Sequence, residues 1–211
     1  VLLEIADGSI KSVASDGHRL AFNSISAKNN YTGNIQAIIP RKAVLQLTKI
    51  LGSSTDQVEI HIGNNFLKAV TDEYILTTRL VEHKYPEYRK VIPKNPTIEI
   101  TMQKNDFKRA LQRTAILSNE RFRGIKLEFK PNSLKITASN PEHEAAEEEI
   151  ITDYQGSDFS ICLNVNYLLD NINIFKKDEV KLHLTNETSP IIIEEIGGEH
   201  ESTFVIMPLR L

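Results

Sequence analysis

The chain has 211 residues, of which 40% are hydrophobic and 25% are charged, proportions that exclude a collagen-like or disordered chain. The length suits one large domain or two modest ones. The formal net charge of −3 lacks the basic excess typical of nucleic-acid-binding proteins. The longest apolar run, Phe204 to Met207, is far shorter than the ~20 residues of a membrane helix, so we expect a soluble protein with no membrane partner. A single cysteine, Cys162, excludes an intrachain disulfide and predicts a reducing, cytoplasmic location.

The net charge averages over segments of opposite sign. Pro40 to Gly52 carries three basic residues and no acid, and Gln103 to Arg123 carries six basic residues against two acids. By contrast, Pro141 to Asp153 carries six acids and no Lys or Arg, and Glu194 to Glu201 carries four acids. This sorting predicts one electropositive face and one electronegative face.

The first half of the chain is predicted to contain strands interrupted by one helix. Leu3 to Val13 is predicted to form a hairpin, because Asp7 and Gly8 can supply the positive φ angles of a two-residue turn. Pro40 suits the first turn of a helix, on which Val44, Leu47, Ile50 and Leu51 share one side while Lys42, Gln46 and Lys49 share the other. Alternation and β-branched residues predict further strands at residues 19–27, 34–39, 58–62, 66–70 and 74–81.

The second half resembles the first. At an offset of 124, six identities occur in fourteen positions, namely Leu3, Glu4, Ser9, Lys11, Ala14 and Ser15, which recur as Leu127, Glu128, Ser133, Lys135, Ala138 and Ser139. At the same offset, Pro40 at one helix start corresponds to Asn164 at another. We therefore expect two copies of one domain, at residues 1–88 and 89–211.

The second copy carries a strand and a helix that have no counterpart before Val1. Asn105 is predicted to cap that helix, with Phe107, Ala110, Leu111 and Thr114 facing inward and Lys108, Arg109, Gln112 and Arg113 facing outward. The first copy thus lacks its opening, and we expect the chain to be a fragment of a longer one. A complete copy is two rounds of strand, helix and several strands, which gives an α+β fold with two helices on antiparallel sheets.

Three segments resemble enzymatic sites, but simpler interpretations are preferred. His143 and Glu144 begin a zinc-peptidase-like motif, yet Glu147 stands where the second histidine must be. Asp16-Gly17-His18 is better explained as a turn with an Asx hydrogen bond, and Cys162 as a buried strand cysteine. We expect no catalytic residue, no metal site and no cofactor.

Four separated motifs carry a family resemblance. They are Ser15 to Ala21, Tyr85 to Lys94, Ala115 to Gly124 and the chain's end, Phe204 to Leu211. In this order and spacing they resemble the bacterial DNA polymerase III beta subunit, the sliding clamp, over most of its middle domain and all of its last one. The resemblance implies a non-catalytic processivity factor, a head-to-tail homodimeric ring whose helices line a central hole.

The resemblance also implies a hydrophobic pocket for short linear peptides. Lys90, where relatives often have Arg, and Pro190, where a small hydroxyl is common, put the rim chemistry in doubt. Aromatic residues that line one side of the family's pocket would fall upstream of Val1. The pocket wall carried over by motif is Ser15, Gly17, His18, Arg19, Leu20, Pro86, Val91, Asn164, Tyr167, Val205, Met207, Pro208, Leu209 and Arg210.

The implied partners are of two kinds. Double-stranded DNA would be held without sequence reading by weak phosphate contacts. The polymerase III alpha subunit, the clamp loader, other DNA polymerases and mismatch-repair proteins would bind through their peptides. The residues expected to face DNA are Arg41, Lys42, Lys49, Lys108, Arg109 and Arg113.

Two other functions stay open at this stage. The chain could be a free-standing peptide-binding adaptor whose basic helices are incidental, or a hydrolase that uses Asp16 and His18. An adaptor would bind peptides but ignore DNA topology, whereas a hydrolase would lose turnover in a His18→Ala variant.

Overall fold

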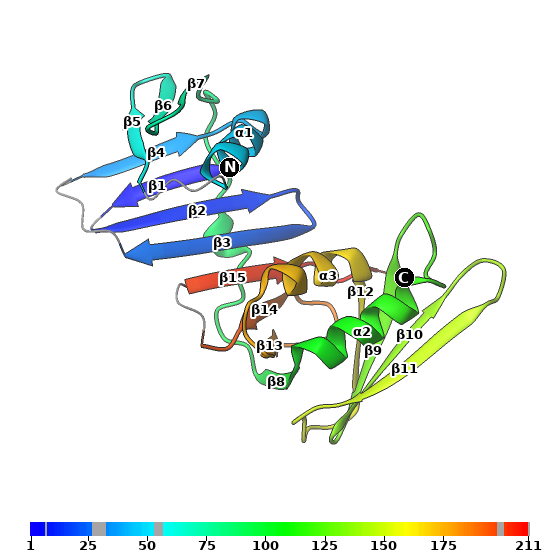
Figure 1. Ribbon diagram of the computed structural model, residues 1–211. Coiled ribbons are helices and arrows are strands. Elements are labelled where there is room, and N and C mark those ends of the chain that lie inside the picture. The colour runs from blue at the N-terminus through cyan, green and yellow to red at the C-terminus, as the bar shows by residue number, and fades with distance from the viewer. Residues whose placement is uncertain (7, 27–32, 53–56, 198–200, 211) are drawn as a thin grey trace. The chain divides into compact units, whose positions relative to one another are not determined.

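The computed structural model describes the whole chain except residues 7, 27–32, 53–56, 198–200 and 211. The chain divides into two compact units, which are described separately (Figure 1). The N-terminal unit comprises Val1–Ser15 and Phe22–Tyr88, and the C-terminal unit comprises Asp16–Ala21 and Arg89–Leu211. The short segment Asp16–Ala21 therefore belongs to the same unit as residues 89–211, which come much later in the chain.

The N-terminal unit has two antiparallel groups of strands and one described α-helix. Its first group has the order β4-β1-β2-β3, and its second group is β5-β6-β7. The helix α1 (Arg41–Leu51) follows Pro40 directly and joins the two groups. The strands are β1 (Leu2–Ala6), β2 (Ser9–Ser15), β3 (Arg19–Ser26), β4 (Asn34–Ile38), β5 (Glu59–Ile62), β6 (Phe66–Val70) and β7 (Ile75–Arg79).

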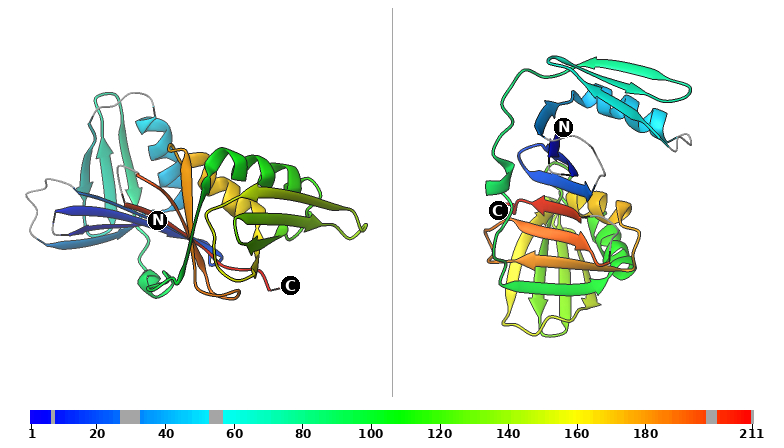
Figure 2. Two further views of the ribbon diagram at one scale, coloured as in Figure 1. Left: turned by 90° about the horizontal axis from the view of Figure 1, so that it is seen from below. Right: turned by 90° about the vertical axis from the view of Figure 1, so that its left-hand side faces the viewer.

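The C-terminal unit follows a 3-10 turn, η1 (Tyr88–Lys90), and contains two rounds of strand, helix and three or more strands. One of its sheets has the order β11-β10-β9-β12, and the other strands run in the order β15-β14-β13-β8. The helix α2 (Lys104–Ala115) packs on β10 and β11 and lies beside α3 (Val165–Ile174), as Figure 2 also shows. The strands are β8 (Ile98–Gln103), β9 (Gly124–Lys130), β10 (Ser133–Ser139), β11 (Ala145–Ile151), β12 (Phe159–Asn164), β13 (Glu179–Leu184), β14 (Ile191–Glu195) and β15 (Glu201–Ile206).

The internal repeat predicted from the sequence is confirmed by the strand registers. Leu3 pairs with Ser12, and adding 124 to both numbers gives Leu127 and Ile136, which are also paired. The same holds for the outer neighbours, because Ile5 pairs with Ile35 and Phe129 pairs with Phe159. The two copies therefore share hydrogen-bond register as well as sequence, and the α+β class is confirmed.

The two cores differ in extent. In the C-terminal unit, the large side chains of Phe107, Leu111, Phe129 and others are fully buried between the helices and both groups of strands. In the N-terminal unit, Ile39, Ala43, Leu67 and Ala69 form a small cluster under α1. The C-terminal unit thus has the larger apolar core, which is the dominant stabilising term in a fold of this size.

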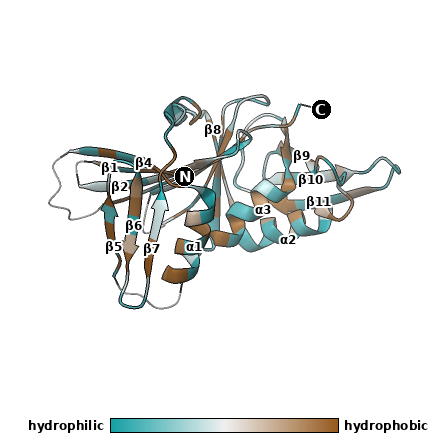
Figure 3. Ribbon diagram, turned by 90° about the horizontal axis from the view of Figure 1, so that it is seen from above, coloured by the Kyte–Doolittle hydropathy of each residue, from teal (hydrophilic) through white to brown (hydrophobic). Residues whose placement is uncertain are grey.

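The predicted amphipathic pattern is confirmed on α2 but only in part on α1, where Val44 and Leu47 pack against the core while Leu51 is exposed (Figure 3). On α2, the four residues expected inside, Phe107, Ala110, Leu111 and Thr114, are all buried. The prediction that Asn105 caps α2 is wrong, because the helix begins at Lys104, two residues before the start that this cap implies, with Gln103 in the cap position. The Lys104 amide donates to the Asp178 carbonyl at 2.8 Å. A backbone carbonyl therefore satisfies one amide at the start of α2, where no side chain caps the helix.

Candidate functional site

The candidate site begins with a tight turn in the C-terminal unit. Gly17 has φ +88°, a conformation that side-chain-bearing residues rarely adopt. One oxygen of the Asp16 carboxylate, Oδ1, accepts hydrogen bonds from the amides of His18 (3.1 Å) and Arg19 (3.0 Å). The prediction of an Asx turn is therefore confirmed. Partial burial acts to raise the pKa of Asp16, but these hydrogen bonds and the Arg19 side chain outweigh it and lower the pKa.

Arg19 connects this turn to α3. Its Nε donates to Asp16 Oδ2 at 3.1 Å, and its Nη1 donates to Asp170 Oδ2 at 2.6 Å. The guanidinium carbon lies 4.4 Å from the centre of the Tyr167 ring. Tyr167 and Asp170 are three residues apart on α3 and so share one side of the helix. Burial alone would lower the pKa of Arg19, but the bonds to Asp170 and Asp16 raise it.

The C-terminal tail extends alongside the same turn. The amide of Met207 donates to the His18 carbonyl at 2.9 Å, and the amide of Leu209 donates to the Cys162 carbonyl at 2.8 Å. Leu209 also lies close over Gly124, where an added Cβ would be only 3.2 Å from Leu209 Cδ1. The tail thus joins β12, β9 and the turn, with Met207, Pro208 and Leu209 half-buried and Arg210 exposed.

Asn164 and Phe122 extend this surface at the start of α3. Asn164 caps the helix, because its side-chain oxygen accepts from the amide of Asn166. Its Nδ2 donates to the Phe122 carbonyl at 3.1 Å, which places the 53% exposed Phe122 beside the site. Sequence reasoning did not assign Phe122 or Asp170 to the site. Phe122 belongs to a motif that was recognised, and Asp170 could have been found from its helical spacing to Tyr167.

The remaining residues expected in the pocket wall have different surroundings. Leu20 and Val205 are 3% and 0% exposed, so they support the surface from beneath. Val91 is half-buried in the C-terminal unit. Ser15 and Pro86 are exposed and belong to the N-terminal unit.

The basic residues expected to face DNA lie on α1 and α2. Arg41, Lys42 and Lys49 are exposed on α1, and on α2 Arg109 is exposed while Lys108 is half-buried. Arg113 is exposed too, but it forms a two-pronged ion pair with Glu148 of β11, with Nη2 to Oε2 at 2.7 Å. This pair raises the pKa of Arg113 and lowers that of Glu148. The prediction that basic and acidic segments occupy separate faces is therefore wrong at this point, because β11 packs directly against α2.

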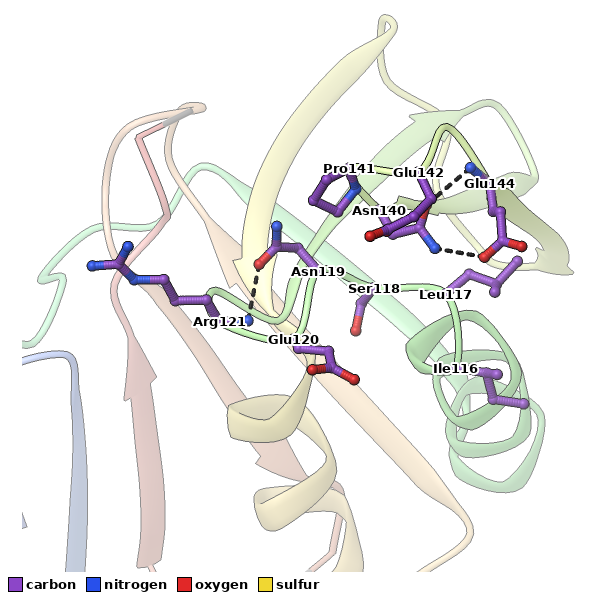
Figure 4. A pocket seen from close by; sticks show the side chains of 10 residues that line it. All are labelled: Ile116, Leu117, Ser118, Asn119, Glu120, Arg121, Asn140, Pro141, Glu142 and Glu144. Carbon is purple, nitrogen blue, oxygen red and sulfur yellow. Dashed lines mark hydrogen bonds between the residues drawn. The ribbon is translucent and has the colours of Figure 1, made fainter.

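A separate pocket of about 600 Å³ lies between the end of α2 and the turn before β11 (Figure 4). Its rim is acidic, with Glu120, Glu142 and Glu144. The Asn140 side chain closes its turn by bonding both the amide and the carboxylate of Glu144. None of the residues expected in the peptide pocket lines this hollow.

The other motifs considered for chemistry have structural roles. His143 has φ +65° in the turn before β11, and Cys162 is half-buried on β12, where burial raises the pKa of its thiol. In the described part of the chain, no group of three or more His, Cys, Asp and Glu residues could hold a metal ion. The described helices also include none that could cross a membrane.

Comparisons with known proteins agree with the resemblance in the motifs. Residues 1–87 match the model for the DNA polymerase III beta subunit, central domain, and residues 89–210 match the model for its C-terminal domain. The beta sliding clamps of Pseudomonas putida and Proteus mirabilis are 40% and 41% identical over the whole chain. The chain spans 57% of the length of each of these relatives.

Solved structures give the same result. A crystal structure of the DNA polymerase III subunit beta from Pseudomonas aeruginosa has a TM-score of 0.96 at 38% identity, and it covers 100% of this chain and 57% of its own. The beta sliding clamp from C. crescentus has a TM-score of 0.94 at 27% identity, with the same coverage. The chain therefore belongs to the DNA polymerase III beta subunit, or sliding clamp, family.

Proposed function

We propose that the chain acts, within a longer subunit, as a sliding-clamp processivity factor of the bacterial replicative polymerase. The observation that carries this proposal is the ordered match of both units to clamp domains over nearly every residue. In this role a homodimeric ring would encircle duplex DNA and tether its partners without catalysing a reaction. The location of such a role is the bacterial cytoplasm.

The surface formed by Arg19, Tyr167, Phe122 and the C-terminal tail is the proposed peptide-binding site. It combines an aromatic ring, a deformable methionine and a proline that restrains the tail, and these are suitable features for accepting several short apolar peptides. The proposed occupants are linear segments of the polymerase III alpha subunit, the clamp loader, other DNA polymerases and mismatch-repair proteins. Asp16 is better suited to holding the turn than to hydrolysis, because both of its carboxylate oxygens accept hydrogen bonds there.

The exposed basic residues of α1 and α2 are the proposed DNA contacts. Lysine and arginine side chains on helices can bind phosphates without reading bases, which is what a protein that slides along DNA requires. Arg109 is the better candidate on α2, since Arg113 already has Glu148 as a partner.

The test of the peptide site is a fluorescence anisotropy titration with a labelled hexapeptide that ends in Leu-Phe. Removing residues 207–211 should abolish binding, and Leu209→Ser should weaken it, because the tail supplies part of the apolar lining. Ile151→Ser, which changes an exposed apolar residue on β11, is the matched control. Unchanged affinity after removal of the tail would refute the site.

Retention on circular and on linear DNA distinguishes a clamp from a peptide-binding adaptor. The longer subunit that contains this chain should remain on circular DNA and slide off a linear end. An adaptor would bind the hexapeptide equally well and be retained on neither.

A further inference from the structure

Four side chains form a cluster that we call the arginine cluster, namely Asp16, Arg19, Tyr167 and Asp170. Arg19 contacts all three of the others, through two charge-assisted hydrogen bonds and one ring face. The two carboxylates come from different places in the fold, because Asp16 lies in the turn and Asp170 on α3.

The two carboxylates bind Arg19 in different structural contexts. The Arg19–Asp16 bond stays within one turn of the chain, so it orders residues 16–19 among themselves. The Arg19–Asp170 bond spans 151 positions and joins that turn to α3. The Asp170 bond therefore fixes where the turn lies, whereas the Asp16 bond fixes its shape.

The flat guanidinium group suits this arrangement. It can present two N–H groups to two carboxylates while one face covers an aromatic ring, which the ammonium group of lysine cannot do in the same way. With Asp170 as an acceptor, the guanidinium group is held across the Tyr167 ring, and the Arg19 side chain is only one third exposed. Arg19 thereby becomes part of the wall rather than a free cation at its rim.

The position of the turn also matters for the tail. The His18 carbonyl, next to Arg19, accepts the Met207 amide, so a displaced turn would lose a tail contact. We propose that Asp170 is a positioning residue of the peptide surface, which holds Arg19 over Tyr167 and so keeps the turn and the tail in register. This inference rests on the proposed peptide-binding function.

The test combines affinity with local order. We would measure hexapeptide affinity for Asp170→Asn, Arg19→Met, their double variant, Asp170→Glu and the exposed control Asp158→Asn. Amide hydrogen exchange at His18 and Met207 would be measured in the same proteins, and thermal unfolding would check that each variant folds. Asp170→Asn preserves size and removes only the charge.

Asp170→Asn should weaken peptide binding about five-fold, in line with the loss of one partly exposed ion pair, while Asp158→Asn should change nothing. Arg19→Met should weaken binding at least as much, because it also removes the Asp16 bond and the contact with Tyr167. The double variant should be no worse than Arg19→Met, since that variant already lacks the Asp170 contact. Asp170→Glu should restore part of the affinity, and exchange at the His18 and Met207 amides should be faster in both Asp170→Asn and Arg19→Met than in the unaltered chain.

Three results would overturn the inference. They are an affinity loss below two-fold in Asp170→Asn, additive losses in the double variant, or unchanged exchange at Met207. If the unaltered chain does not bind the hexapeptide, the proposed function fails instead. The exchange measurement then still decides whether Asp170 positions the turn and the tail.

Discussion

Asp16 is the residue on which the order of the turn depends. Its carboxylate accepts hydrogen bonds from two backbone amides and from one arginine N–H. Both oxygens act as acceptors, which the ionised form of the carboxylate provides. Gly17 can adopt the positive φ of this turn but also many other conformations, so the hydrogen bonds to Asp16 select the one observed.

The first prediction concerns acid. The pKa of Asp16 is lowered from its ordinary value of 3.8, so the ionised carboxylate is favoured in the folded chain. The stabilisation it gives is therefore present above that ordinary value and is lost as the pH falls through the lower folded pKa. An NMR titration that follows the side-chain carboxyl carbon of Asp16 should find its shift constant from neutral pH to about pH 5. The shift should then change with a midpoint below 3.8, the ordinary value for aspartate. A midpoint at or above 3.8 would contradict this assignment.

At the scale of elements, the helices present two kinds of basic residue. Those on α1 and both Arg109 and Arg113 on α2 are exposed, but Arg113 also forms an ion pair with Glu148. A cation that already has a carboxylate partner gains less from a phosphate, because it must share or give up that partner.

The second prediction is a difference between two arginines on one helix. Arg109→Gln should weaken binding to a random-sequence duplex at low salt more than Arg113→Gln does. Reversing Lys42, Lys49 and Arg109 to Glu together should reduce the slope of log affinity against log salt by about three, if each contacts one phosphate. Anisotropy on two unrelated duplexes checks both points. Equal effects of the two glutamine variants, or loss on one duplex alone, would contradict the proposed surface.

Elements with strong local patterns could be predicted from the sequence. The repeat at an offset of 124 predicted two copies of one domain, and Leu3 and Leu127 do occupy equivalent positions in their strand pairs. The buried face of α2 followed from its periodicity in the same way. The Asn105 cap was wrong because a distant backbone carbonyl, that of Asp178, satisfies the helix start instead.

Contacts between residues far apart in the chain could not be predicted from local sequence patterns. The ion pair between Arg113 and Glu148 forms because β11 packs against α2. The ion pair between Arg19 and Asp170 forms because the turn lies next to α3. The motifs indicated Arg19 and Tyr167 through a family resemblance, but only the fold brings Asp170 to them.

At the scale of the whole molecule, apolar surface is unevenly distributed. Nine of the large hydrophobic residues that are exposed among the described residues belong to the N-terminal unit, including Phe66 and Ile75, and four belong to the C-terminal unit. Each apolar side chain left in water forgoes the free energy that burial would give. The N-terminal unit therefore has less stabilisation from its core.

The third prediction follows from that difference. Hydrogen exchange resolved by residue should find the β1 amides less protected than the equivalent β9 amides, and the β6 amides less protected than those of β14, because local stability follows buried apolar contact. Adding denaturant should remove protection from the N-terminal unit first. Uniform protection in both units would contradict the account of the two cores.

The turn at Asp16–Ala21, α3 and the C-terminal tail form the proposed peptide-binding surface. The most direct measurement is NMR chemical-shift mapping of the chain titrated with the hexapeptide ending in Leu-Phe. We expect the largest changes at His18, Arg19, Tyr167, Met207 and Leu209. Changes concentrated instead at the pocket lined by Ile116–Arg121 and Asn140–Glu144, or on the basic faces of α1 and α2, would contradict it.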